Sequence, residues 1–152
     1  MVSIRDKPWL GGLITGITGL LAILLPVRFA YISEVNIAIW MWGLISGSAE
    51  GFTQFMMFGD TLGITISIVD LYLSIIIFTS FITAKKYEIS KRISNLWIIC
   101  GILYLISAML YLILHIGVFM IPGSFFGFSL FLLSFAGAVG ITSGVYMRRG
   151  PN

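Results

Sequence analysis

The sequence predicts an all-α membrane bundle of four transmembrane helices, with a small extracellular β-sheet in the first loop. Hydrophobic residues make up 59% of the 152 positions, charged residues make up 10%, and the mean hydropathy is +1.05. A water-soluble domain of this size needs more polar surface. Four long apolar runs divide the chain, and eight of the nine Lys and Arg residues lie in three short clusters at the ends of these runs.

The four apolar runs cover residues 9–25, 61–84, 96–119 and 125–147. At about 1.5 Å of rise per residue, each run is long enough to cross about 30 Å of hydrocarbon as a helix. No small-x-small cleavage pattern follows the first run, so we expect it to be retained as a membrane helix and not removed as a signal. Together the runs predict a single membrane domain over residues 1–152.

The basic residues predict the orientation of these helices. They cluster before the first run, around residues 85–92 and at residues 148–149, which are all on one side of a four-span topology. Because basic residues favour the cytoplasmic side, we expect a multi-pass plasma-membrane protein with both termini cytoplasmic. The net charge of +3 indicates contact with anionic membrane lipid and no nucleic-acid partner, since the basic residues sit beside apolar spans.

Residues 26–60 have two interpretations. Residues 37–58 are apolar enough for a fifth helix, but that helix would place Glu50 near the bilayer centre, at a cost of about 2.5 to 3.5 kcal/mol. The segment is also rich in β-branched and aromatic residues separated by Ser, Glu and Gly, a pattern typical of short strands. We therefore predict an external β-rich loop over residues 26–60.

This loop contains a short aromatic motif and four charged residues. On a strand Trp40 and Trp42 have the same parity, so both should lie on one face, with Met41 on the other. We expect one face, that of the tryptophans, to rest on the helix ends or on the membrane surface, and the opposite face to be a contact surface of net acidic charge. The motif comprises Trp40, Trp42, Gly43 and Leu44, and the contact and charge surface comprises Arg28, Glu34, Glu50 and Asp60.

Asp70 is the ionisable residue that lies well inside a predicted helix. Counting from Thr61 at the outer face, it lies about 14 Å deep. The same count places several polar residues at that level, and these form a predicted intramembrane polar layer: Asp70, Thr15, Ser107, Tyr111 and Ser134. Intramembrane carboxylates often mark ion or proton paths, but here the expected neighbours are hydroxyls, so a structural, hydrogen-bonded carboxyl is favoured.

Small residues recur four apart in the first and last helices. The positions are Gly12 and Gly16 in the first helix, and Ala136, Gly140 and Gly144 in the last. This spacing lets helix backbones approach closely. It predicts packing within the bundle, with a dimer seam as the alternative.

The sequence indicates neither an enzyme nor a cofactor. His115 is placed where it could meet Glu50 or Asp60, but the His, Cys and carboxylate residues do not have the spacing of a metal site. Cys100 lies inside an apolar run and is interpreted as a packed thiol. No glycine run matches a dinucleotide or phosphate loop.

Several short sequence features occur together with the four-span plan: Leu10-Gly11, Leu25-Pro26, Trp42-Gly43-Leu44-Ile45, Gly101 to Leu105, and the Gly- and Ala-rich last span. In these features the chain resembles the claudin and peripheral myelin protein 22 superfamily. The chain departs from claudins at Phe29 and Ile45, where they have tryptophan. It also lacks their two loop cysteines, so the family's disulfide is absent here.

The resemblance implies a protein that makes lateral or cell-to-cell contacts through its external loop, in family terms a barrier or an ion path. The expected partners are membrane lipid and either further copies of the chain or a larger membrane protein. Two alternatives remain open. One is an accessory subunit of a larger channel, transporter or membrane enzyme, and the other is a small transporter that uses Asp70.

Overall fold

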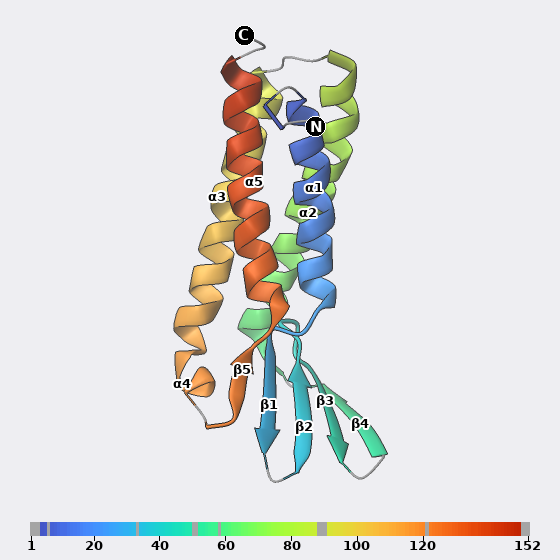
Figure 1. Cartoon of the computed structure of the whole chain (residues 1–152), viewed down its shortest axis with the longest axis vertical. Helices are drawn as coiled ribbons and strands as arrows, with labels where there is room; N and C mark the ends of the chain where they lie inside the picture. Colours follow the sequence, from blue (N-terminus) through green and yellow to red (C-terminus); the bar gives the residue numbers. More distant parts are fainter. Residues whose placement is uncertain are drawn as a thin grey trace.

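Within the described residues, the computed structural model is a bundle of four long helices extended at one end by a small antiparallel sheet (Figure 1). The structure describes residues 4–5, 7–32, 34–49, 52–57, 59–87, 91–120 and 122–149. The helices are α1 (Pro8–Leu24), α2 (Thr61–Tyr87), α3 (Lys91–Leu114) and α5 (Phe128–Arg149), with the short α4 (Ile116–Phe119) after α3. The beginning of α1 and the end of α5 lie together, opposite the sheet.

Three of the described helices are long and apolar enough to cross a membrane, judged by length and composition. Their apolar ranges are Thr61–Lys85, Lys91–Leu114 and Phe128–Arg149. The fourth, α1, is apolar but has 17 residues, which is near the lower limit of about 17 for a transmembrane helix. The chain therefore has the composition and helix lengths of a membrane protein.

The sheet has five strands in the described part of the chain, in the order β4-β3-β2-β1-β5. The strands are β1 (Arg28–Ile32), β2 (Val35–Ile39), β3 (Leu44–Ala49), β4 (Phe52–Met57) and β5 (Ser124–Phe126). Every neighbouring pair is antiparallel. Strands therefore occupy the region where a fifth helix was the alternative, and that helix does not form in the described residues.

Strand β5 corrects the predicted start of the last helix. Residue 125 was expected to begin the helix, but Phe125 pairs with Phe29 of β1 and α5 begins at Phe128. Gly127 separates the two elements, and a Cβ there would lie 2.1 Å from the Pro26 carbonyl oxygen. This close backbone approach brings the chain alongside β1, and a short apolar run does not distinguish a strand from the first turn of a helix.

The inner face of α1 consists almost entirely of small residues. Gly12 lies against the Trp97 ring of α3, where an added Cβ would come within 2.2 Å, and Gly16 lies against the backbone of Phe78 in α2. The buried residues of this helix are Gly11, Gly12, Thr15, Gly16, Gly19 and Ala22. The helix therefore packs backbone against side chain, a contact that lipid alone does not drive.

Helix α5 uses the same kind of contact with α3. A Cβ on Gly144 would lie 2.8 Å from the Ser94 carbonyl oxygen, and one on Gly140 would lie 3.2 Å from the Thr15 side chain of α1. Ala136 is fully buried. All five small residues singled out from the sequence are thus covered by other helices of the same chain, which favours packing within the bundle over a dimer seam.

One turn residue has a backbone conformation that its side chain disfavours. Glu34 lies in the two-residue connection between β1 and β2 with φ of 69°, a left-handed conformation that costs about 1 to 2 kcal/mol for a residue with a Cβ. Glu34→Gly should therefore raise the free energy of unfolding by about 1 kcal/mol, measured by chemical unfolding in detergent micelles. Asn36→Gly, in the neighbouring strand β2, should lower it. A Glu34→Gly protein no more stable than the parent would contradict this prediction.

Candidate functional site

Two tryptophan side chains of the sheet bind the end of α1. The indole Nε1–H of Trp40 donates a hydrogen bond to the Leu24 carbonyl oxygen at 2.8 Å, and that of Trp42 donates to the Ile23 carbonyl oxygen at 3.0 Å. The last four carbonyl groups of a helix have no partner within the helix. The two indoles satisfy two of them and fix the sheet to the bundle.

The tryptophans reach α1 from a turn, not from a strand as the sequence analysis predicted. Strand β2 ends at Ile39, and Gly43 N–H donates to the Trp40 carbonyl oxygen at 3.0 Å, with φ of 92° at Gly43. Leu44 then begins β3. The parity argument failed because the left-handed glycine turns the chain at the motif itself. Both indoles nevertheless reach the helix end, and Met41 is buried.

Arg28 is buried beneath the sheet and does not belong to a contact surface. It is 4% exposed, and its guanidinium Nη2 donates to the Ser124 hydroxyl of β5. Burial lowers the pKa of Arg28, an effect opposed by the nearby Tyr111 hydroxyl. Arg28 was predicted to be exposed, and this prediction is wrong, because its position on β1 directs the side chain to the covered face of the sheet.

The other charged residues of the predicted contact surface also lie apart. Glu34 is exposed at the β1–β2 connection. Glu50 lies outside the described residues. Asp60 caps α2, where its Oδ1 accepts from the Gly63 backbone N–H at 3.0 Å. The described residues therefore form no acidic contact surface.

Asp60 also joins the beginning of α2 to the end of α3. Its Oδ2 lies 2.9 Å from His115 Nε2, which is one of the two contacts the sequence suggested for this histidine. The His115 ring stacks on Tyr111 at 4.1 Å between centroids, and its Nδ1 lies 3.0 Å from the Tyr111 carbonyl oxygen. In the described part of the chain, no group of three or more His, Cys, Asp or Glu residues could hold a metal ion.

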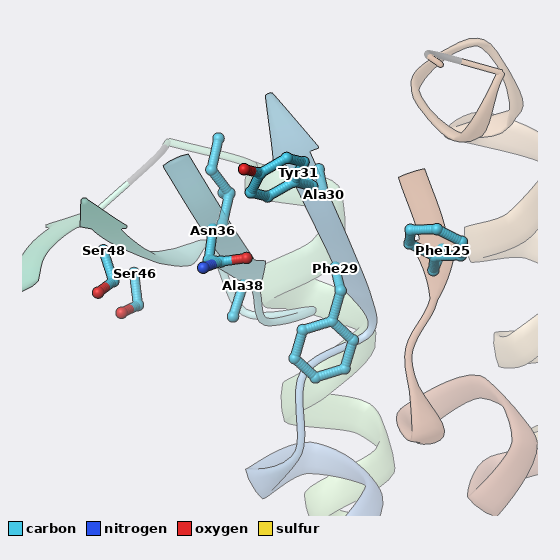
Figure 2. Close-up of a pocket in the computed structure, with 9 residues that line it drawn as sticks. Phe29, Ala30, Tyr31, Asn36, Ala38, Ser46, Ser48 and Phe125 are labelled. Atoms are coloured by element: carbon cyan, nitrogen blue, oxygen red, sulfur yellow. The ribbon is translucent and has the colours of Figure 1, made fainter. Parts of the chain in front are cut away.

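The face of the sheet turned away from the buried Arg28 side chain carries aromatic and uncharged residues, and we refer to it as the aromatic face. Figure 2 shows Phe29 and Tyr31 on β1 and Phe125 on the neighbouring strand. They border a shallow hollow of about 300 Å³ whose other lining residues are Ala30, Asn36, Ile37, Ala38, Ser46 and Ser48. Phe55 of β4 pairs with Ser46 and stands on the same face beyond it.

The sequence analysis missed this face, although its signal was present. Along β1 the exposed residues Phe29 and Tyr31 alternate with the buried residues Arg28 and Ala30. That alternation is the period of a strand with one covered face. Arg28 in the buried set hid the pattern, because a charged residue is normally assigned to the exposed face.

The predicted polar layer exists in part. Asp70 is fully buried and the Ser107 hydroxyl faces it from α3, whereas Tyr111 lies closer to the sheet, beneath His115. Ser134 is exposed and donates to the Leu130 carbonyl oxygen of its own helix. Thr15 is buried against Gly140 of α5. Ser134 was misplaced because a depth estimate gives height along a helix but not the direction in which a side chain points. Thr15 does point into the bundle, but it lies one turn further from the sheet than Gly19, which is the residue of α1 that contacts Ser74 and Tyr104.

Ser74 and Tyr104 belong to this region and were not predicted. Their hydroxyl oxygens are 2.6 Å apart, and Ser74 Oγ donates to the Asp70 carbonyl oxygen at 2.8 Å. Gly19 of α1 leaves room for both, because a Cβ there would lie 2.3 Å from the Tyr104 hydroxyl.

A comparison with known proteins adds no assignment, since no protein-family model and no curated protein matches the chain.

The tryptophan contacts with α1 are directly testable. Trp42→Phe keeps the aromatic ring but removes the donor to the Ile23 carbonyl oxygen, so it should lower the free energy of unfolding by about 1 kcal/mol. Unfolding in detergent micelles, followed by tryptophan fluorescence, is the measurement. Trp9→Phe is the control, because the Trp9 ring contacts Lys85 Nζ through its face at 5.4 Å to the centroid. Equal losses in the two variants would argue against the indole hydrogen bond.

Proposed function

We propose that the protein is a multi-pass plasma-membrane protein of claudin-like arrangement, with four spans, both termini cytoplasmic and the sheet outside the cell. Large apolar side chains are exposed on the helices, for example Leu21 on α1, Ile106 on α3 and Phe131 on α5, as expected of surfaces that face lipid. Basic residues lie at the end of the bundle opposite the sheet, where α5 ends with Arg148 and Arg149. This distribution supports the cytoplasmic orientation of that end.

The orientation predicts which residues are accessible from outside the cell. A cysteine introduced at Glu34, which is exposed on the sheet, should react with a membrane-impermeant thiol reagent added to intact cells, in a Cys100→Ser background. A cysteine at Arg92, at the beginning of α3, should react only after the membrane is permeabilised. The reverse pattern would invert the topology, and reaction of both in intact cells would exclude a membrane between them.

We further propose that the aromatic face mediates lateral or cell-to-cell contact with another protein. Its exposure supports this function: Tyr31 is 55% exposed, and Phe55 and Phe125 are each 66% exposed. None of the nine residues that line the hollow is charged. Clustered exposed aromatic side chains with few charges are typical of the core of a protein interface.

The contact has two possible partners. A second copy of the chain, in the same or an apposed membrane, would produce a lateral or junctional assembly, in which a barrier or an ion path could form. A larger channel, transporter or membrane enzyme would make the chain an accessory subunit. Both use the same face, so the face can be tested before its partner is known.

Strand β4 offers a matched pair of variants for this test. Phe55 and Met56 are neighbours with the same exposure of 66%, but they pair with Ser46 and Ile45 respectively, so they lie on opposite faces of the sheet. Phe55→Ser should weaken association at least tenfold, and Met56→Ser should change it little. The measurement is cross-linking in membranes followed by purification in mild detergent and mass analysis, at matched expression.

The products also separate the two partners. Cross-linked multiples of 16.8 kDa, the mass of the chain, would favour self-association, and a stoichiometric larger protein would favour the accessory role. Equal association of the Phe55→Ser and Met56→Ser proteins would refute contact through the aromatic face.

A further inference from the structure

The carboxyl group of Asp70 lies in the core of the bundle, where no cationic side chain of the described residues contacts it and the Ser107 hydroxyl of α3 faces it. Asp70 has 0% exposure, and among the described residues neither of its carboxylate oxygens accepts a hydrogen bond of good geometry. Burying an ionised carboxylate without compensation is very costly, and the cost persists in a membrane. The group must therefore be neutralised by something other than a side chain of the described residues.

The surroundings of Asp70 follow from the pairing of α2 with α3. Ser67, Asp70 and Ser74 are spaced three and four apart on α2, and Tyr104, Ser107 and Tyr111 have the same spacing on α3, so each set shares one helix face. The bond between Ser74 and Tyr104 fixes the register of these antiparallel helices. One helical turn nearer to the sheet than this bond, Asp70 of α2 lies opposite Ser107 of α3. Ser67 of α2 lies one further turn toward the sheet.

Several oxygen atoms at this level are available to bind a ligand. Ser67 is 4% exposed, and its hydroxyl has no hydrogen-bond partner among the described residues. The Ser107 hydroxyl faces Asp70, but no hydrogen bond of good geometry forms between them. In contrast, the Ser74 and Tyr104 hydroxyls are bonded to each other. Helices α2 and α3 also pack less closely than the other neighbouring helix pairs.

We propose that Asp70, Ser67 and Ser107 bind a monovalent cation of the size of sodium between α2 and α3. The ligands would be the carboxylate of Asp70 and the hydroxyls of the two serines, with water completing the shell. Hard cations prefer oxygen ligands of this kind. A single carboxylate balances one positive charge, whereas a divalent ion would leave an uncompensated charge in the core.

The residues above and below Asp70 differ, being polar toward the sheet and apolar away from it, which indicates that the cation enters from the sheet end of the bundle. Toward the sheet, the α3 face continues with Tyr111, whose ring stacks on His115, and His115 contacts Asp60. Away from the sheet, the same face continues with Cys100 and Trp97, which are 2% and 0% exposed. The Trp97 indole donates to the Ser80 hydroxyl of α2 at 2.6 Å and closes the gap between the helices.

The test measures thermal unfolding of the full chain in detergent, with sodium chloride replaced by choline chloride at constant ionic strength. Sodium should raise the melting temperature of the parent protein by a few degrees at a concentration about ten times its dissociation constant. Asp70→Asn should keep the fold, seen by circular dichroism, and lose this rise. Ser67→Ala should shift the sodium response to at least threefold higher concentration.

Ser143→Ala is the matched control, because Ser143 is a fully buried serine of α5 whose hydroxyl donates to the Val139 carbonyl oxygen of its own helix. It should keep the sodium response of the parent. An equal sodium response in the parent and Asp70→Asn would overturn the site. A melting temperature that changes with pH but not with sodium anywhere between about pH 5 and pH 9 would also overturn it and assign a proton to Asp70. Neither result depends on whether the aromatic face binds a protein.

Discussion

The arrangement of the sheet depends on the carbonyl groups at the end of α1. Where a helix stops, its last carbonyl groups need donors that the helix itself does not provide. Here the donors are the indoles of Trp40 and Trp42, which belong to the turn between β2 and β3. Fixing that turn fixes the central hairpin. The directions of β1, β4 and β5 follow by pairing, and so does the direction in which the aromatic face points.

The bundle and the sheet solve the problem of polar groups in different ways. Inside the bundle, glycine lets backbones approach, and hydroxyl groups bind neighbouring carbonyl groups, as Ser94 Oγ does with the Gly144 carbonyl oxygen at 2.7 Å. At the junction, charged side chains are used, each with a defined partner: Arg28 with Ser124, and Asp60 with both Gly63 and His115. Arg28 and Asp60, two of the four charged residues that suggested a recognition surface, are therefore structural. The hollow on the aromatic face is lined by aromatic, aliphatic and small polar side chains, none of them charged.

The sequence predicted the features that depend on composition and missed those that depend on direction. Helices and the β-rich loop followed from long apolar runs and from β-branched residues, and the contact of His115 with Asp60 followed from their similar height. Strand β5 was missed because two phenylalanines before Gly127 fit a strand or a helix equally well. The burial of Arg28 and the outward position of Ser134 depend on which way a side chain points around its element. That direction is set by partners distant in the sequence, such as Ser124 for Arg28.

The contacts of α1 and β1 also constrain how the chain is assembled. Helix α1 packs against α5, and β1 pairs with β5, although α1 and β1 are synthesised about 100 residues before α5 and β5. Until residues 124–149 emerge, the glycine face of α1 lacks one of its neighbours and the Ser124 acceptor of Arg28 does not yet exist. Contacts between segments so distant in sequence form slowly and leave surfaces temporarily uncovered. A nascent chain that stops before residue 124 would thus leave Arg28 without Ser124 and the small-residue face of α1 without α5. Incompletely packed surfaces of this kind are features that cellular quality control can detect.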